Sequence, residues 1–108
     1  IIDTLIETST KHGFKLAVLY RTEPHFVSED SEFIQTLLNV YEENTGEKGY
    51  CLSIGGGTYV HGIPNAVAFG AEFPNDMNNM HGADEFITID SLLLNAKIYA
   101  DAILRICG

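Results

Sequence analysis

The chain has 108 residues, of which 15 are acidic and six are basic, giving a formal net charge of −9. A surface with this charge repels phosphate backbones and anionic lipid headgroups, which argues against nucleic acid as a partner. No stretch approaches the roughly 20 consecutive apolar residues needed to cross a bilayer, so no membrane partner is expected either. A chain of this length can form one domain with a modest core.

The first 25 residues differ in character from the rest. An apolar helical face near the N-terminus ends at Gly13, and the apolar residues 14–20 predict a strand. Pro24 then favours an extended connector, and the composition changes there. The sequence begins within the helical pattern and without a capping residue, so we expect Ile1 to be an internal residue of a longer protein.

Helices and short apolar runs alternate in the remainder. Residues 31–46 predict a helix capped by Asp30, and residues 90–106 predict a second helix capped by Asp90. Between them, residues 50–54 and 66–70 have the length and composition of buried strands. This alternation predicts an α/β fold in which neighbouring strands run parallel.

A run of three glycines follows the first of these predicted strands. Gly55, Gly56 and Gly57 precede Thr58, and such a turn lets a carboxylate or another oxyanion approach backbone N–H groups closely. The run matches neither of the glycine patterns that bind nucleotides. A tight turn required only by the fold is the alternative, and function is modestly favoured over it.

His81 lies in a polar loop between the second predicted strand and the last helix. Composition alone favours a solvated histidine, because zinc normally requires three or four protein ligands and this segment offers one. Glu85, Asp84 and Asp76 are close enough in sequence to orient its imidazole. His61 follows the glycine run and can point toward the same pocket.

The stretch from Gly55 to Ile103 resembles the C-terminal end of peptidase V-like dipeptidases, of the di-zinc metallopeptidase family that includes carnosinase and aminoacylase. The matching features are the GGGTY turn, the VAFG run, an acidic loop with proline, H-x-x-x-E, and a helix containing KIYADAI. The likeness extends to the flanking segments and so covers essentially the whole chain. It implies an α/β fold: the C-terminal part of a zinc-peptidase-type catalytic sheet with helices (26–108), preceded by the tail of an inserted α+β lid domain (1–25).

The resemblance also implies roles for individual residues. His81 matches the last metal ligand of one of two zinc sites, and Gly55, Gly56, Gly57 and Thr58 match the turn that lines the substrate pocket. Glu85 matches an acidic residue that supports the loop. His61 replaces an arginine found in many relatives and inherits no role. The family's other metal ligands, its general base and its lid histidine have no match, so no catalytic residue lies within this chain.

The resulting prediction is a fragment of a cytoplasmic, zinc-dependent dipeptidase. The expected partners are a dipeptide substrate, the remainder of the same polypeptide, and further copies of the fragment through self-association. The complete site would hold two zinc ions, and the fragment alone is predicted to be inactive. Two alternatives remain: a deacylase of N-acyl amino acids with the same fold, and a non-catalytic α/β module that binds a small anion. The cysteines, Cys51 and Cys107, match no CxxC pattern and are typical of a reducing compartment.

Overall fold

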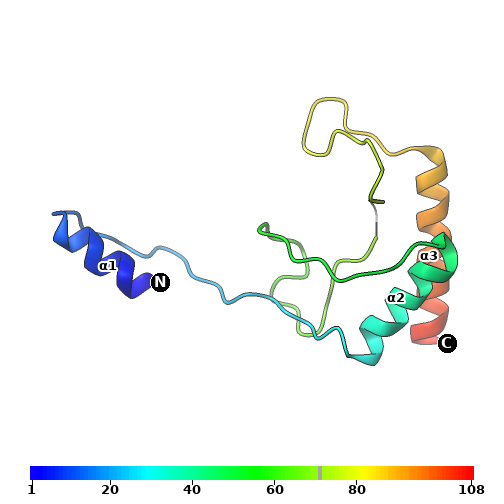
Figure 1. Cartoon of the computed structure of the whole chain (residues 1–108), viewed down its shortest axis with the longest axis horizontal. Coiled ribbons are helices and arrows are strands. Elements are labelled where there is room, and N and C mark those ends of the chain that lie inside the picture. Colours follow the sequence, from blue (N-terminus) through cyan, green and yellow to red (C-terminus); the bar gives the residue numbers. More distant parts are fainter. Residues whose placement is uncertain (71) are drawn as a thin grey trace.

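The computed structural model of the chain describes residues 1–70 and 72–108. It contains three helices in the order α1 (Ile2–Lys11), α2 (Glu32–Thr45) and α3 (Ile89–Cys107). Helices α2 and α3 lie side by side, whereas α1 stands apart at the end of a long extended segment (Figure 1). The pair formed by α2 and α3 is the structured centre of the molecule.

Each end of α2 is fixed by a local cap. The Ser31 hydroxyl accepts a hydrogen bond from the Ile34 backbone N–H at 3.3 Å, which satisfies one of the unpaired donors in the first turn. Gly46 has φ of 74° and ends the helix in the left-handed conformation, as the sequence predicts. The prediction of Asp30 as the cap is wrong by one residue.

The start of α3 is also shifted relative to the prediction. Thr88, in extended conformation, accepts a hydrogen bond from the Ser91 backbone N–H at 3.1 Å and is the capping residue. Asp90 lies inside the first turn instead, where a negative charge is favoured by the exposed N–H groups of the helix. The helix therefore begins one residue before the predicted range.

A small core joins α2 to α3. Leu37 and Val40 from α2 pack against Ile98 and Ala102 from α3, and Val40 and Ile98 are 0% and 1% exposed. Partly buried aromatic and aliphatic side chains of the intervening segment close over this cluster, among them Val67, Phe69 and Phe73. The buried stripe thus lies where α3, after the connecting residues 46–88, packs back against α2.

Polar groups clamp the far ends of the same two helices. Arg105 donates hydrogen bonds to Asp101 at 2.9 Å and, across the helix pair, to Glu43 at 3.1 Å. Asn44 donates to the Asp101 carboxylate at 2.9 Å. The hydrogen bonds from Arg105 hold the pKa values of Glu43 and Asp101 below their ordinary range, with Asn44 adding to the effect at Asp101.

The predicted α/β sheet is wrong for the residues that the structure describes. Residues 14–20, 50–54 and 66–70 contain no strand. A strand exists only where a neighbouring backbone supplies the ladder of hydrogen bonds, and β-forming composition alone cannot replace that neighbour. No described segment pairs with these three, so they run as single extended or irregular chains.

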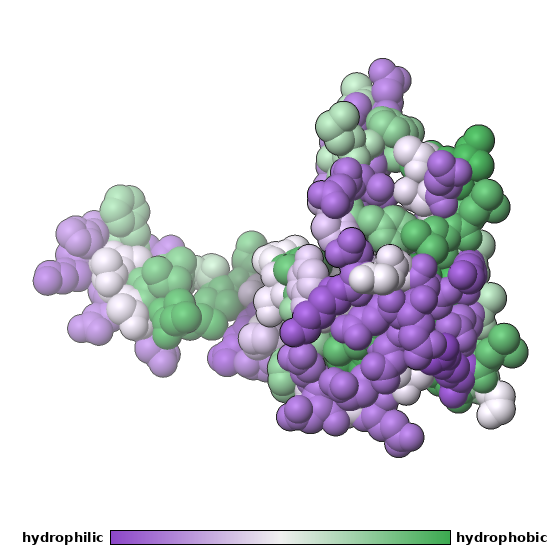
Figure 2. Space-filling model, turned by 45° about the vertical axis from the view of Figure 1, so that its right-hand side comes forward, coloured by the Kyte–Doolittle hydropathy of each residue, from purple (hydrophilic) through white to green (hydrophobic). Residues whose placement is uncertain are grey.

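The molecule is correspondingly open. Its Cα radius of gyration is 19.2 Å, whereas a compact domain of this length has about 13 Å. Apolar side chains remain on the surface at both ends of the molecule (Figure 2), and Leu19 is 94% exposed. None of the helices within the described residues has the length and apolarity needed to span a membrane.

Candidate functional site

His81 lies on a small loop that closes on itself. We call residues 78–86 the His81 loop. The Phe86 N–H donates to the Asn78 carbonyl at 3.0 Å and joins the two ends, and the Gly82 N–H donates to the Asn79 carbonyl at 2.7 Å near the tip. The loop projects from the start of α3, away from α2 (Figure 1). Its shape is therefore set largely by its own backbone.

Three non-glycine residues of this loop have left-handed backbone conformations. The φ angles are 51° at Asn79, 61° at His81 and 56° at Asp84. Such conformations are uncommon outside glycine and persist where surrounding hydrogen bonds fix them, often at functional sites. The Asn79 amide, which donates to the Ala83 carbonyl at 3.4 Å, is one of those bonds.

The segment that leads into the loop is tied to the N-terminus of α3. Asp76 accepts one hydrogen bond from the Ser91 hydroxyl at 3.1 Å and another from the Phe73 N–H at 3.3 Å. Thr88 donates to the Ser91 hydroxyl at 2.9 Å. The two segments that flank the loop are thereby joined through a single buried serine.

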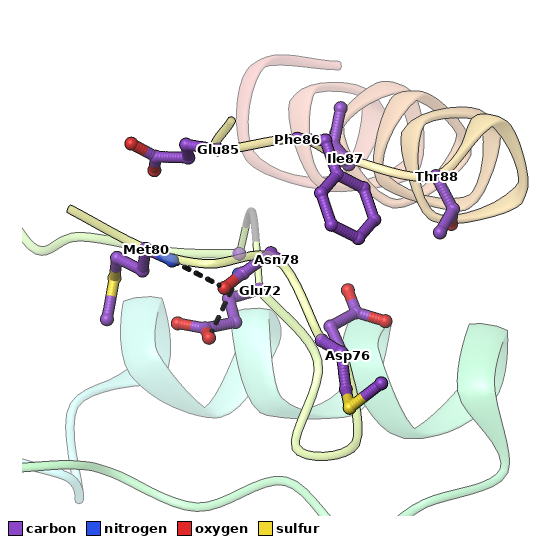
Figure 3. Close-up of a pocket in the computed structure, with 10 residues that line it drawn as sticks. Glu72, Asp76, Asn78, Met80, Glu85, Phe86, Ile87 and Thr88 are labelled. Carbon is purple, nitrogen blue, oxygen red and sulfur yellow. Dashed lines mark hydrogen bonds between the residues drawn. The ribbon is translucent and has the colours of Figure 1, made fainter. Parts of the chain in front are cut away.

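A shallow cavity of about 500 Å³ lies beside this junction (Figure 3). Carboxylates and apolar side chains line it together, and Glu85 and Phe86 come from the His81 loop itself. Figure 3 shows the Glu72 and Glu85 side chains on separate segments of the chain, with Met80 between them in this view. The wall contains Glu85 but not His81, so the cavity is a neighbour of the histidine and does not enclose it.

The His81 side chain is exposed and makes no hydrogen bond with any described residue. Neither Asp76 nor Glu85 orients its imidazole, because Asp76 is bonded to Ser91 and Phe73 and Glu85 faces the cavity. Nowhere among the described residues do three histidine, cysteine, aspartate or glutamate side chains gather to hold a metal ion. The described residues of this chain therefore cannot form a zinc site by themselves. His81 provides one imidazole that could serve as a metal ligand.

The glycine run forms an exposed turn at some distance along the chain from the loop. A side chain placed on Gly55, Gly56 or Gly57 would meet nothing within 4 Å, and none of the three has a left-handed φ. Thr58 accepts hydrogen bonds from the Val60 N–H through its hydroxyl and from the His61 N–H through its carbonyl. No described hydrogen bond joins this turn to the His81 loop.

His61 has a partner that the sequence does not suggest. Its ring lies 6.0 Å, centroid to centroid, from the ring of His25 in the connector. The His25 Nε2 atom in turn lies 2.6 Å from the Ala66 carbonyl oxygen. Residues 26–60, which separate the two histidines, carry no signal of this contact, and neither ring approaches His81 through a described interaction.

The sequence reasoning missed Asn78 and expected a different partner for Asp76. Asn78 bonds to Met80, Glu72 and Phe86, and Asp76 anchors the segment before the loop to Ser91 instead of orienting His81. The asparagine-rich stretch 75–79 is the sequence feature that could have drawn attention to these two residues. Their hydrogen-bond partners could not be predicted, because each partner lies on a segment whose position depends on loop closure.

Comparison with known proteins finds relatives that carry dipeptidase names. The chain is 46% identical over 107 residues to the Beta-Ala-Xaa dipeptidase of Lactobacillus delbrueckii subsp. lactis, a match that covers 96% of this chain and 23% of that protein. It is 42% identical over 93 residues to a Bacillus subtilis protein with a provisional dipeptidase name, covering 86% of the chain and 20% of the relative. A similarly named Staphylococcus epidermidis protein is 36% identical over 106 residues.

These matches confirm the resemblance to dipeptidases. The chain spans about a fifth to a quarter of the length of these curated relatives. No protein-family model matches the chain. No solved structure matches it either.

Proposed function

Because this chain is homologous over almost its whole length to one segment of proteins named dipeptidases, we propose that it is a part of a zinc-dependent dipeptidase. The complete protein would hydrolyse dipeptides. This segment contributes one metal ligand and part of the substrate pocket, and it contributes no catalytic residue. The remainder of the same polypeptide supplies the other metal ligands.

His81 is the proposed ligand. Its imidazole is exposed and free of hydrogen bonds within the described part of the chain, so a metal would displace no protein partner from it. Its left-handed backbone lies in a loop held closed by two short backbone hydrogen bonds. A fixed loop that presents a free nitrogen donor suits a ligand completed from elsewhere, because preorganisation lowers the cost of binding.

Zinc is the proposed cofactor of the complete protein, with two ions per active site. The donor set among the described residues is too small to retain an ion, so the other ligands would come from the remainder of the polypeptide. Glu85 lines the adjacent cavity from the same loop, and we give it a supporting role at the metal side of the pocket.

The glycine turn is the proposed substrate-facing element. Gly55, Gly56 and Gly57 have open space around them and no packing reason for the absence of a side chain within this structure. A short peptide could therefore lie against the backbone there, with Thr58 at the end of the turn. Close approach of a substrate would explain the three glycines, which packing within this structure does not explain.

The remaining assignments follow the same family. Residues 1–25, which hold α1 apart from the helix pair, are proposed to belong to the lid, and residues 26–108 to the catalytic domain. A reducing, cytoplasmic location is supported by Cys51 and Cys107, which are exposed and unpaired.

Substrate turnover tests the proposal against the deacylase of the same family. The product of the complete open reading frame would be purified and supplied in parallel with a β-alanyl dipeptide and with an N-acetyl amino acid. We expect hydrolysis of the dipeptide, since the relatives carry dipeptidase names. Preferential release of acetate would contradict the proposal.

A further inference from the structure

The Asn78 side chain makes one hydrogen bond within the His81 loop and another to a residue outside it. Its Oδ1 atom accepts a hydrogen bond from the Met80 N–H at 3.1 Å, next to His81 in the chain. Its Nδ2 atom donates to the Glu72 carboxylate at 3.0 Å, outside the loop. Its backbone carbonyl accepts the Phe86 N–H that closes the loop. Figure 3 shows the amide between Met80 and Glu72.

These contacts act on the residues that precede His81. The bond to the Met80 N–H fixes the peptide between Asn79 and Met80, one residue before the histidine, and the bond to Glu72 holds the Asn78 amide in that orientation. Asn79 and His81, on either side of Met80, both have left-handed backbone conformations, which residues other than glycine rarely adopt. The arrangement thus links the direction of the His81 Cα–Cβ bond to the orientation of one amide.

We infer that Asn78 is a positioning residue for His81: it sets the backbone conformation from which the imidazole is presented to the metal. This inference rests on the proposed function of His81 as a ligand and adds a residue that has no part in binding itself. Asn78 does not touch the metal or the substrate in this account. It acts only through the loop.

The chemistry requires an amide at this position. One polar atom of the side chain must accept a hydrogen bond from a backbone N–H while the other donates one to a carboxylate. The asparagine amide has both groups. An aspartate would retain the acceptor for Met80, but its second oxygen would face Glu72 without a proton between them. Asn78→Asp should therefore loosen the loop, and adding Glu72→Gln should restore it, because the new amide can donate to the new carboxylate.

The test begins with nuclear magnetic resonance of the 108-residue chain. Asn78→Ala is expected to speed amide exchange at Met80 about fivefold, as loss of one hydrogen bond implies. The three-bond HN–Hα coupling and the Cα shift of His81 should move toward values averaged over several conformations. Asn75→Ala is the matched control, since Asn75 lies in the same segment, is exposed and makes no described hydrogen bond.

Zinc retention by the product of the complete open reading frame separates positioning from general support of the loop. We expect Asn78→Ala and Asn78→Asp to weaken zinc retention, and the double variant Asn78→Asp/Glu72→Gln to recover it. Unchanged His81 coupling in Asn78→Ala would overturn the inference. Altered coupling with unchanged zinc retention would overturn it as well, because Asn78 would then be merely structural.

The two proposals fail differently. The resonance measurements need no metal, so they report on Asn78 whether or not His81 binds zinc. If His81→Ala leaves the zinc content unchanged, the proposed ligand role fails. If His81→Ala releases zinc while Asn78→Ala does not, only the positioning role fails.

Discussion

Gly70 is a residue at which backbone conformation and packing act together. Its φ is 80°, and a Cβ atom there would lie 2.7 Å from the hydroxyl oxygen of Tyr99. That hydroxyl donates to the Phe69 carbonyl at 3.1 Å and is not free to move aside without losing the bond. Only glycine meets both constraints at this point of the segment that covers the helix pair.

Gly70→Ala is therefore expected to destabilise the chain by about 1 to 3 kcal/mol, through left-handed strain and the clash with Tyr99. Urea unfolding followed by circular dichroism at 222 nm measures the change. Gly46→Ala is the matched control: its φ is 74° but its added side chain meets nothing within 4 Å, so strain alone applies. Equal losses in the two variants would contradict the packing argument.

The sequence located His81 in a polar loop, and the structure agrees. What it could not provide was the set of left-handed residues around it or the role of Asn78. Both depend on the bond between the Phe86 N–H and the Asn78 carbonyl, which forms only when the loop closes. Hydrogen-bond partners of this kind follow from geometry and leave no periodic pattern in the chain.

Helices were the elements most accessible from sequence. All three lie where apolar periodicity predicted them, and the first two end near the predicted glycines, because those signals arise within each helix. The predicted strands failed because a strand needs a partner, and the described residues supply none. Residues 14–20 illustrate the difference: their composition favours a strand, yet nothing pairs with them.

Helix α3 has two apolar faces, and the structure buries only one of them. Helical spacing predicts one apolar face, but the structure leaves that face exposed; its residues are Leu93, Ala96, Ala100 and Ile103. The stripe packed against α2 contains Ile98 and Ala102, together with two buried polar residues near the start of the helix. A helix with two apolar faces cannot indicate from its own sequence which face meets its neighbour.

The buried stripe leads to a direct stability test. Ile98→Val removes one methylene from a side chain that is 1% exposed and should cost about 0.5 to 1.5 kcal/mol. Ile103→Val makes the same chemical change on the exposed face of α3 and should cost far less. Urea denaturation of both variants compares them, and a larger loss at Ile103 would contradict the observed packing.

The clamp around Arg105 predicts a pH dependence of the helix pair. Arg105 lowers the pKa values of Glu43 and Asp101, whose ordinary values are 4.5 and 3.8. In this pH range the folded form therefore binds fewer protons than the unfolded form. The stabilisation from the clamp is complete above pH 4.5 and is lost as the pH falls through the lowered pKa values of the folded form.

Helical content measured during acid titration checks this clamp. The unmodified chain should lose stability more steeply below pH 4.5 than the Arg105→Met variant, in which neither carboxylate accepts a hydrogen bond from Arg105. The difference should shrink in high salt, because the three side chains are at the surface. Identical titration curves for the two proteins would exclude a contribution from the clamp.

At the scale of the whole molecule, the structure is too open to bury its apolar surface. The radius of gyration of 19.2 Å and the exposed face of α3 mean that much of the apolar surface stays in contact with water. Large exposed apolar patches favour association. We therefore expect the isolated 108-residue chain to self-associate as its concentration rises.

Sedimentation velocity over a range of concentrations measures that association. Leu93→Lys with Leu104→Lys places two charges on the exposed face of α3 and should shift the distribution toward the monomer. Exchanging Glu7 and Glu29, both exposed, for glutamine is the control, because it changes the net charge by the same two units away from the exposed face of α3. A monomer at every concentration in the unmodified chain would contradict the prediction.

The most direct test of the central claim is the zinc content of the complete open reading frame product with His81→Ala. His12→Ala is the control, because His12 is an exposed histidine at the end of α1. We expect His81→Ala to lose bound zinc and dipeptide hydrolysis, His12→Ala to keep both, and the 108-residue chain alone to show neither. Full zinc retention by the His81→Ala protein would contradict the account.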